Sequence, residues 1–170
     1  MAQIVFITGG QRSGKSSYAQ KMALRQQSHP LYIATAKVWD DEFASRIKRH
    51  RADRDERWTT LEEPLYLSNI QLNGQAAVLD CITLWLTNII DHCTNNPEAS
   101  LAFAKSEFTK LANQEGQLFV VSNEIGMGLH ADTSLGRMFT DLQGWTNQFL
   151  AQQAHQVVFM VSGIPLKIKE

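Results

Sequence analysis

A glycine-rich segment near the start of the chain constrains its fold more than any other feature. Residues Gly9-Gly-Gln-Arg-Ser-Gly-Lys-Ser16 match the spacing G-x-x-x-x-G-K-S of a phosphate-binding loop. The short apolar run Gln3-Ile-Val-Phe-Ile-Thr8 precedes this loop, and a helix-compatible stretch over 15–26 follows it. Because such a loop joins a strand to a helix, this context predicts a nucleotide-binding α/β domain.

Each residue type in the loop has a chemical reason. Glycine permits backbone torsions that point successive N–H groups at phosphate oxygens, and the N-terminus of the following helix adds its dipole. Lys15 can neutralise β- and γ-phosphate oxygens, and Ser16 can ligate Mg²⁺. The predicted nucleotide-binding residues of the loop are Gly9, Gly10, Gln11, Arg12, Ser13, Gly14, Lys15 and Ser16.

The apolar runs along the chain predict a parallel sheet. Continuous apolar strands are typical of a sheet covered on both faces, and their alternation with helix-compatible stretches is typical of α/β folds. We expect strands at 3–8, 31–34, 76–79, 118–121 and 157–161, and helices at 15–26, 41–51, 82–93, 97–114 and 133–155. Since no repeat or linker interrupts this pattern, residues 1–170 are expected to form a single catalytic domain.

The composition excludes several classes of protein. With 16 basic and 17 acidic residues the net charge is -1, which argues against a broad electrostatic nucleic-acid binder. The two cysteines, Cys81 and Cys93, form neither a metal-binding pattern nor a disulfide framework, and Cys81 is expected to be a buried thiol. The apolar run 157–161 is far too short to span a membrane, and no secretory signal is visible, so we expect a cytoplasmic protein.

A carboxylate is expected beside the phosphate loop to complete a magnesium site. Asp80 directly follows the run 76–79, and Glu124 comes shortly after the run 118–121. Asp80 has the closer pattern, but the sequence leaves the choice between them open. The motifs of signalling GTPases and protein kinases are missing, which leaves a small-molecule kinase, a nucleotidyltransferase or an ATP-driven binding module.

His50 bears on the choice among these classes. If residues 41–51 form a helix, Phe43, Ile47 and His50 share one face at positions i, i+4 and i+7. Imidazole is nucleophilic near neutral pH, so a histidine near an α-phosphate could carry a covalently bound nucleotide. The same spacing also fits a structural histidine, and both interpretations stay open on the residues alone.

Further segments match one known family in their order and spacing. They are 8–16, 31–35, 40–42, 44–47 with His50, Arg54, 58–62, 80–83, 87–88, 122–128 and 161–169. With these segments the chain resembles, almost from end to end, the bifunctional adenosylcobinamide kinase / adenosylcobinamide-phosphate guanylyltransferase family of bacterial cobalamin synthesis. The later segments make the resemblance far more specific than the phosphate loop alone.

The resemblance implies roles for individual residues. His50 matches the histidine that carries GMP in the family, and with Lys15 it would be catalytic. Ser16 and Asp80 would hold Mg²⁺, although the family often has glutamate where this chain has the shorter Asp80. The further nucleotide-binding residues implied by the resemblance are Thr35, Ala36, Lys37, Arg51, Ala52, Asp53, Arg54, Glu62 and Asp80.

The resemblance also implies the fold, the reactions and the assembly. It implies a RecA-like P-loop fold, with a mostly parallel central sheet flanked by helices, and a homotrimer. The implied partners are adenosylcobinamide, its phosphate, ATP and GTP, with Mg²⁺ as cofactor and no nucleic acid. In the kinase step the substrate hydroxyl would attack the γ-phosphate of ATP or GTP. In the transferase step GMP would pass from GTP through His50 to the phosphorylated substrate.

Two other functions stay open at this point. A monofunctional P-loop small-molecule kinase would transfer the γ-phosphate while His50 is structural, so no covalent GMP would form. A RecA-type binding module driven by ATP would need a basic stripe, which a net charge of -1 does not favour.

Overall fold

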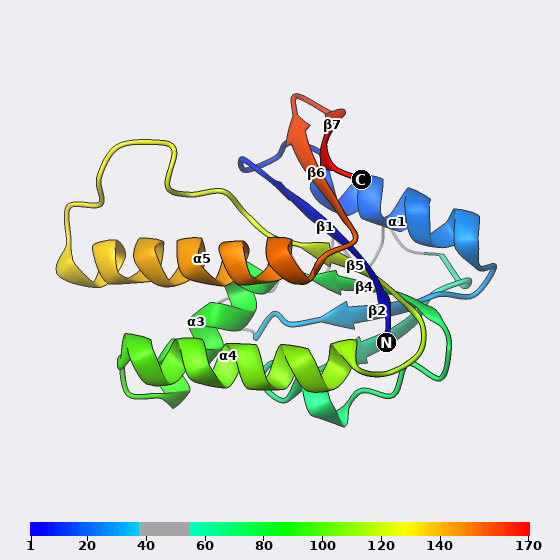
Figure 1. Cartoon of the computed structure of the whole chain (residues 1–170), viewed down its shortest axis with the longest axis horizontal. Helices are drawn as coiled ribbons and strands as arrows, with labels where there is room; N and C mark the ends of the chain where they lie inside the picture. The colour runs from blue at the N-terminus through cyan, green and yellow to red at the C-terminus, as the bar shows by residue number, and fades with distance from the viewer. Residues whose placement is uncertain (38–54) are drawn as a thin grey trace.

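The computed structural model describes residues 1–37 and 55–170. Its central feature is a seven-stranded sheet in the order β3-β2-β4-β5-β1-β6-β7, with helices on both faces (Figure 1). Strands β1 to β6 are parallel, and β7 pairs with β6 in the antiparallel direction. The strands are β1 Gln3–Gly9, β2 Leu31–Ala34, β3 Thr59–Glu62, β4 Ala76–Asp80, β5 Gln117–Val121, β6 Gln156–Val161 and β7 Ile164–Lys169. The predicted fold class, an α/β fold with a mostly parallel sheet, is confirmed.

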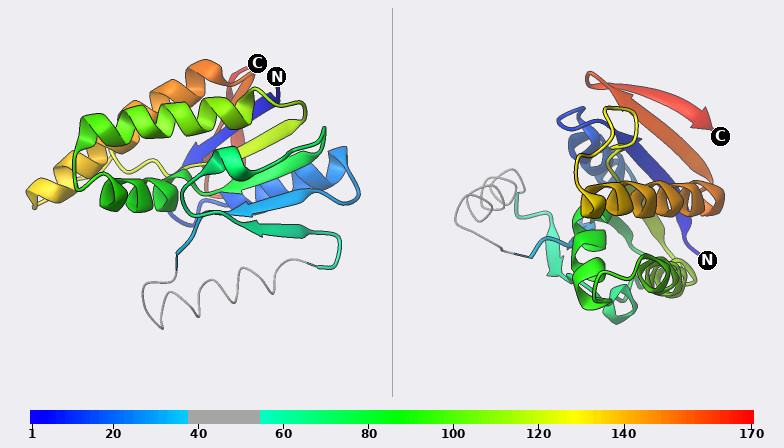
Figure 2. Two further views of the ribbon diagram at one scale, coloured as in Figure 1. Left: turned by 90° about the horizontal axis from the view of Figure 1, so that it is seen from below. Right: turned by 90° about the vertical axis from the view of Figure 1, so that its left-hand side faces the viewer.

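The helices divide into two layers around this sheet (Figures 1 and 2). Helix α1 (Lys15–Gln26) covers one face, while α3 (Ile82–His92), α4 (Pro97–Ala112) and α5 (Ser134–Gln153) cover the other. Successive strand residues point to opposite faces, so Ile4 and Phe6 join the core under α3 to α5 while Val5 and Ile7 join the core under α1. Among the described helices none is both long and apolar enough to cross a membrane.

The predicted elements agree well with this structure. All five predicted strands are confirmed, and so are four of the five predicted helices, with ends that differ by two residues at most. The helix predicted at 41–51 lies outside the described residues. Strands β3 and β7 are not predicted, because most residues of β3 and every residue of β7 are exposed and neither strand has the continuous apolar run of a buried strand.

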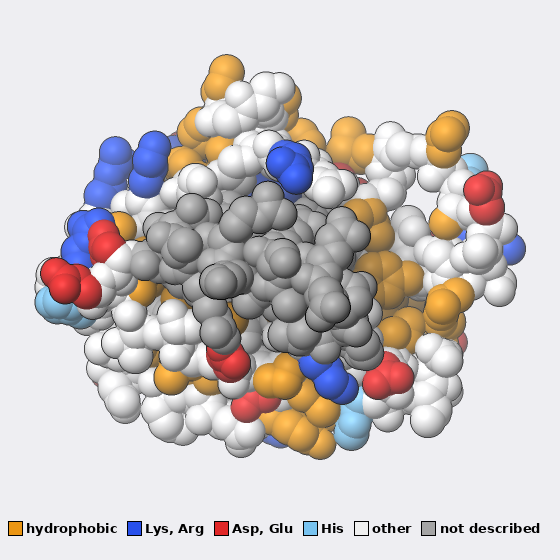
Figure 3. All heavy atoms as spheres, turned by 180° about the vertical axis from the view of Figure 1, so that it is seen from behind, with side chains coloured by type: hydrophobic (Ala, Val, Ile, Leu, Met, Phe, Trp, Pro, Cys, Tyr) orange, Lys and Arg blue, Asp and Glu red, His pale blue; other side chains and the backbone are white. Residues whose placement is uncertain are grey.

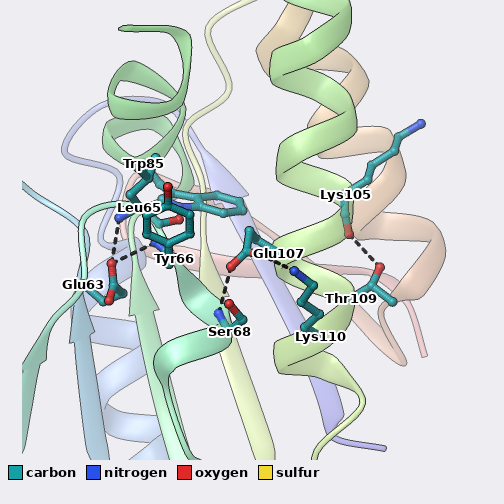
Figure 4. Close-up of polar contacts among 9 residues, drawn as sticks. All are labelled: Glu63, Leu65, Tyr66, Ser68, Trp85, Lys105, Glu107, Thr109 and Lys110. Atoms are coloured by element: carbon teal, nitrogen blue, oxygen red, sulfur yellow. Dashed lines mark hydrogen bonds and ion pairs between the residues drawn. The ribbon is translucent and has the colours of Figure 1, made fainter. Parts of the chain in front are cut away.

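The connection that follows β3 is fixed by side-chain hydrogen bonds (Figure 4). Oε1 of Glu63 accepts from the N–H groups of Leu65 at 3.0 Å and Tyr66 at 2.8 Å. The indole of Trp85, a fully buried residue of α3, donates to the Leu65 carbonyl at 2.9 Å. These bonds secure the chain directly after the end of β3, at the edge of the sheet that carries the candidate site.

Candidate nucleotide-binding site

The parallel strands bring the predicted site residues to one edge of the sheet. The phosphate loop, residues 9–16, begins at the end of β1, Thr35 follows β2, Glu62 ends β3 and Asp80 ends β4. Ala34 at the end of β2 pairs with both Glu62 and Asp80, so these positions are adjacent along the edge. The carboxyl edge of an open parallel sheet is the usual ligand-binding edge of α/β folds.

The phosphate loop has the backbone geometry that phosphate binding requires. Gly14 precedes α1 with a φ of 94°, a left-handed conformation that favours glycine. No described side chain caps the helix, and its first turn contains no acidic residue. The N–H groups and the positive end of the helix dipole are therefore available to an anion.

Lys15 folds back over this loop. Its ammonium donates to the carbonyl of Gly10 at 2.6 Å, and the residue is 7% exposed. Burial lowers the pKa of Lys15, while Cys81 and Asp80 act in the opposite direction. Burial also raises the pKa of the Cys81 thiol to about 12, so this thiol is neutral near pH 7. The expected buried thiol at Cys81 is confirmed.

Two buried hydroxyl groups at the loop have no hydrogen-bond partner among the described residues. They are Oγ1 of Thr8 and Oγ of Ser13, and both residues are 8% exposed. Buried hydroxyl groups in proteins are nearly always paired, because an unpaired one loses its hydrogen bonds to water. Phosphate oxygens bound in the loop would accept from such groups, so these hydroxyls fit a nucleotide ligand.

Neighbouring segments hold the loop at both ends. The N–H of Glu124 donates to the Gly9 carbonyl at 3.0 Å, and the N–H of Gly163 donates to the Ser13 carbonyl at 3.0 Å. The first contact comes from the segment after β5 and the second from the turn between β6 and β7. The loop is thus fixed between two strand ends before any ligand binds.

The geometry favours Asp80 over Glu124 as the acid beside the loop. The Asp80 carboxylate lies close enough to Lys15 to act on its pKa, and its Oδ2 accepts from the hydroxyl of Tyr32 at 2.8 Å. Oε1 of Glu124 instead accepts from the N–H of Gly126 at 2.9 Å, within its own segment. These contacts favour Asp80, and its role as the magnesium-side acid stays a prediction.

A magnesium ion would fit between the loop and Asp80. Ser16 is half-buried in the first turn of α1, and Asp80 is half-buried at the end of β4. Within 1–37 and 55–170 no group of three or more His, Cys, Asp or Glu could hold a metal ion. Mg²⁺ is commonly bound by one or two protein oxygens together with substrate phosphates, which is the donor set available here.

Thr35 has a structural place in the described geometry. It is fully buried, and its hydroxyl donates to the Cys81 carbonyl at 2.8 Å and accepts from the Cys81 N–H at 2.9 Å. The Thr35 carbonyl accepts from the Asn88 amide at 2.8 Å. These bonds join the ends of β2 and β4, while Ala36 is half-buried and Lys37 is exposed.

Part of the predicted site falls outside the described residues. These positions are His50, Arg51, Ala52, Asp53 and Arg54. Glu62 is described and exposed at the end of β3. The predicted nucleotide contacts of all these residues, and those of 35–37, stay predictions.

Sequence reasoning missed two contributors to this edge. Tyr32 and Thr8 both lie in strands that were predicted for their apolar content alone. The signal in each case is a polar atom in an otherwise apolar strand, within three residues of its carboxyl end. Such an atom must find a partner, and at this edge the partner is a site residue or a ligand.

The chain is similar to known proteins over nearly its whole length. Residues 5–168 match the family model described as cobinamide kinase / cobinamide phosphate guanyltransferase. The bifunctional adenosylcobalamin biosynthesis protein CobP of Pseudomonas aeruginosa is 37% identical over 167 residues, covering 96% of this chain and 95% of that protein. The bifunctional adenosylcobalamin biosynthesis protein CobU of Escherichia coli is 34% identical over 181 residues, covering 98% of this chain and 99% of that protein.

A more distant likeness is to a solved structure. The flagellar accessory protein FlaH from Methanocaldococcus jannaschii is 12% identical, with a TM-score of 0.48, and the match covers 98% of this chain and 78% of that chain.

Proposed function

The chain belongs to the cobinamide kinase / cobinamide phosphate guanyltransferase family, and we propose that both of its reactions use one nucleotide site built around Lys15. It is a bifunctional enzyme of adenosylcobalamin biosynthesis, a kinase and a guanylyltransferase in one chain. The observation that carries this function is the family match over 5–168, which includes the phosphate loop and every other predicted site residue.

In the kinase step, the phosphate loop holds the triphosphate of ATP or GTP. The hydroxyl oxygen of adenosylcobinamide attacks the γ-phosphorus, and the bond from that phosphorus to the β,γ-bridging oxygen breaks, so that a nucleoside diphosphate leaves. Lys15 and the loop N–H groups stabilise the negative charge on the transferring group. The buried hydroxyls of Thr8 and Ser13 support this assignment because both lack a partner in the described structure.

In the transferase step, an imidazole nitrogen of His50 attacks the α-phosphorus of GTP and pyrophosphate leaves. A phosphate oxygen of adenosylcobinamide phosphate then attacks the guanylylated histidine, the phosphorus–nitrogen bond breaks, and adenosyl-GDP-cobinamide forms. A covalent intermediate divides one difficult transfer into two easier ones. The support for His50 is its place in the family motif.

The remaining assignments complete the proposal. Ser16 and Asp80 would hold Mg²⁺, which when bound offsets phosphate charge. The residues 35–37 and 51–54 would contact the nucleotide, and the Glu62 carboxylate would accept from the N–H groups of guanine. A homotrimer and a cytoplasmic location follow the family resemblance.

Intact-protein mass spectrometry after incubation with GTP and Mg²⁺ tests the covalent step. The wild-type chain should gain the mass of GMP, and His50→Ala should gain none. His29→Ala, which alters an exposed histidine in the loop before β2, should be guanylylated like the wild type. A folded wild-type chain that binds GTP and phosphorylates cobinamide without gaining GMP would instead be the monofunctional kinase.

A further inference from the structure

The segment between β5 and α5 has no role in the reactions described above. Its first residues are tied to the site: the N–H of Ser122 donates to the Ile7 carbonyl at 2.9 Å, and the N–H of Glu124 to the Gly9 carbonyl at 3.0 Å. Because β5 is parallel to β1 and pairs with it, the segment leaves the sheet at the same edge as the phosphate loop (Figure 1). It is therefore a direct neighbour of the nucleotide site.

A buried polar cluster holds residues 122–124, the base of this segment, in place. The Asn147 amide donates to the Asn123 carbonyl at 3.1 Å, and Asn147 also accepts from Ser122 at 2.7 Å and from Gln143 at 3.0 Å. The N–H of Asn123 donates to the hydroxyl of Thr83 at 3.2 Å. Side chains from α3 and α5 thus fix the peptide groups that lead to Glu124.

Beyond this base the segment exposes apolar side chains. Ile125 is 37% exposed, Met127 76% and Leu129 100%, and residues 125–129 carry no charge. The Glu124 carboxylate accepts from the Gly126 N–H at 2.9 Å and so stays at the base of this stretch. Figure 3 shows hydrophobic side chains at the surface on the side of the molecule that carries this segment. Three exposed apolar residues within five positions, directly beside a catalytic edge, are typical of a binding surface.

We propose that residues 125–129 contact the macrocycle of the cobinamide acceptor, an inference that rests on the proposed function. The acceptor hydroxyl must reach a γ-phosphate held by the phosphate loop, so its macrocycle must lie beside that loop. A corrin ring has broad apolar faces with methyl substituents, which match uncharged apolar side chains. The hydrogen bond from the Glu124 N–H to the Gly9 carbonyl joins the start of this surface to the first residue of the phosphate loop.

Steady-state kinetics of the double variant Met127→Ser/Leu129→Ser tests the proposal. We expect its KM for cobinamide to rise about tenfold or more, since two apolar contacts are lost, while its KM for GTP stays at the wild-type value. Equilibrium dialysis with cobinamide should show the same weakening without any turnover. Ile168→Ser removes an apolar residue that is 63% exposed on β7, the outermost strand of the sheet, and should change neither KM value. Met127→Leu/Leu129→Met keeps the surface apolar and should keep the KM for cobinamide low.

The outcomes separate this inference from the proposed function. If the wild type neither binds nor phosphorylates cobinamide, the proposed function fails and the inference fails with it. If the wild type is active and the serine double variant keeps its KM for cobinamide, the acceptor lies elsewhere and only the inference fails. A rise of both KM values together would show that the segment acts on the phosphate loop, which also overturns the inference. An unchanged KM with a changed elution volume in gel filtration would show that a second copy of the chain covers this surface.

Discussion

The hydroxyl of Tyr32 donates a hydrogen bond to Oδ2 of Asp80 at 2.8 Å. The two residues lie on the adjacent strands β2 and β4, and Tyr32 is 4% exposed. The Tyr32 ring also meets the ring of Trp58 edge to face, with centroids 5.9 Å apart. The bond restrains the orientation of the Asp80 carboxylate at the end of β4.

Tyr32→Phe should therefore weaken the response of the enzyme to Mg²⁺. Groups that orient a metal-binding carboxylate contribute about tenfold or more to metal affinity, so we expect the Mg²⁺ concentration for half-maximal kinase activity to rise by about that factor. Binding of Mn²⁺ to the enzyme–GTP complex, followed by electron paramagnetic resonance, should weaken in parallel. Tyr66→Phe makes the same chemical change at a residue that packs on His92 and Phe103, and it should leave both measurements unchanged. Equal Mg²⁺ requirements in Tyr32→Phe and wild type would contradict the positioning role.

Lys15→Met should lower the activity of the enzyme without lowering the stability of its fold. Removing a cation that contacts the transferring phosphoryl group should lower kcat/KM for GTP by about 10² to 10³-fold. The free energy of unfolding without nucleotide should not fall, because burial of the ammonium disfavours its charged form and methionine fills the same space without a charge. Enzyme kinetics and urea denaturation measure the two effects. Lys21→Met on the exposed side of α1 should change neither, and a similar loss of activity there would argue against a specific role for Lys15.

Strand prediction from the sequence succeeds where burial imposes a pattern. Strands β1, β4 and β5 are buried under helices on both faces of the sheet. Their sequences are therefore continuous apolar runs, which can be recognised without the structure. Strand β7 lacks this pattern, since two lysines and a proline stand among its apolar residues and all six residues are exposed. Its place depends on pairing with β6 through the turn at Gly163, where φ is 83°.

The site residues likewise divide into those that a local motif indicates and those whose contacts depend on the fold. The phosphate loop is a local motif, so spacing alone indicates its residues. The choice between Asp80 and Glu124 depends on where their strands lie relative to Lys15, and no local pattern contains that information. The contact of Tyr32 with Asp80 likewise requires that β2 and β4 be neighbours, although 48 residues separate the two in the chain.

Gly9→Ala should destabilise the chain without nucleotide present. A Cβ at Gly9 would lie 2.5 Å from the Met160 carbonyl oxygen and 2.9 Å from Oγ of Ser13, and the φ of 150° is unfavourable for alanine. Because the carbonyl belongs to the backbone of β6, the clash must separate β1 from β6, and we expect a loss of about 1 to 3 kcal/mol in the free energy of unfolding. A Cβ at Gly10 meets nothing within 4 Å, so Gly10→Ala should keep the wild-type value in the same denaturation experiment. Equal stabilities of the two variants would mean that β6 approaches the loop less closely than described.

Glu107 should make the stability of the chain depend on pH. It is 3% exposed on α4, and it accepts from the Ser68 N–H at 3.0 Å and from Lys110 at 2.7 Å (Figure 4). Burial by itself raises the pKa of Glu107, but the hydrogen bonds from Lys110 and Ser68 outweigh it and hold the pKa below the usual glutamate value. Since the folded pKa is the lower one, the stabilisation is complete above the unfolded value of about 4.3 and is lost as the pH falls through the folded value.

Glu107→Gln should consequently lower the free energy of unfolding by about 1 to 2 kcal/mol at pH 7, because one buried acceptor is replaced by a donor that faces Lys110 or Ser68. The difference from the wild type should shrink as the pH is lowered from about 5 toward 3, where the wild-type carboxylate becomes protonated. Urea denaturation across this pH range measures the difference in the free energy of unfolding. Glu115→Gln, at an exposed position in the turn before β5, should show little difference at any pH. A constant difference between Glu107→Gln and wild type over the whole range would mean that the glutamate stabilises the fold by its shape and not by its charge.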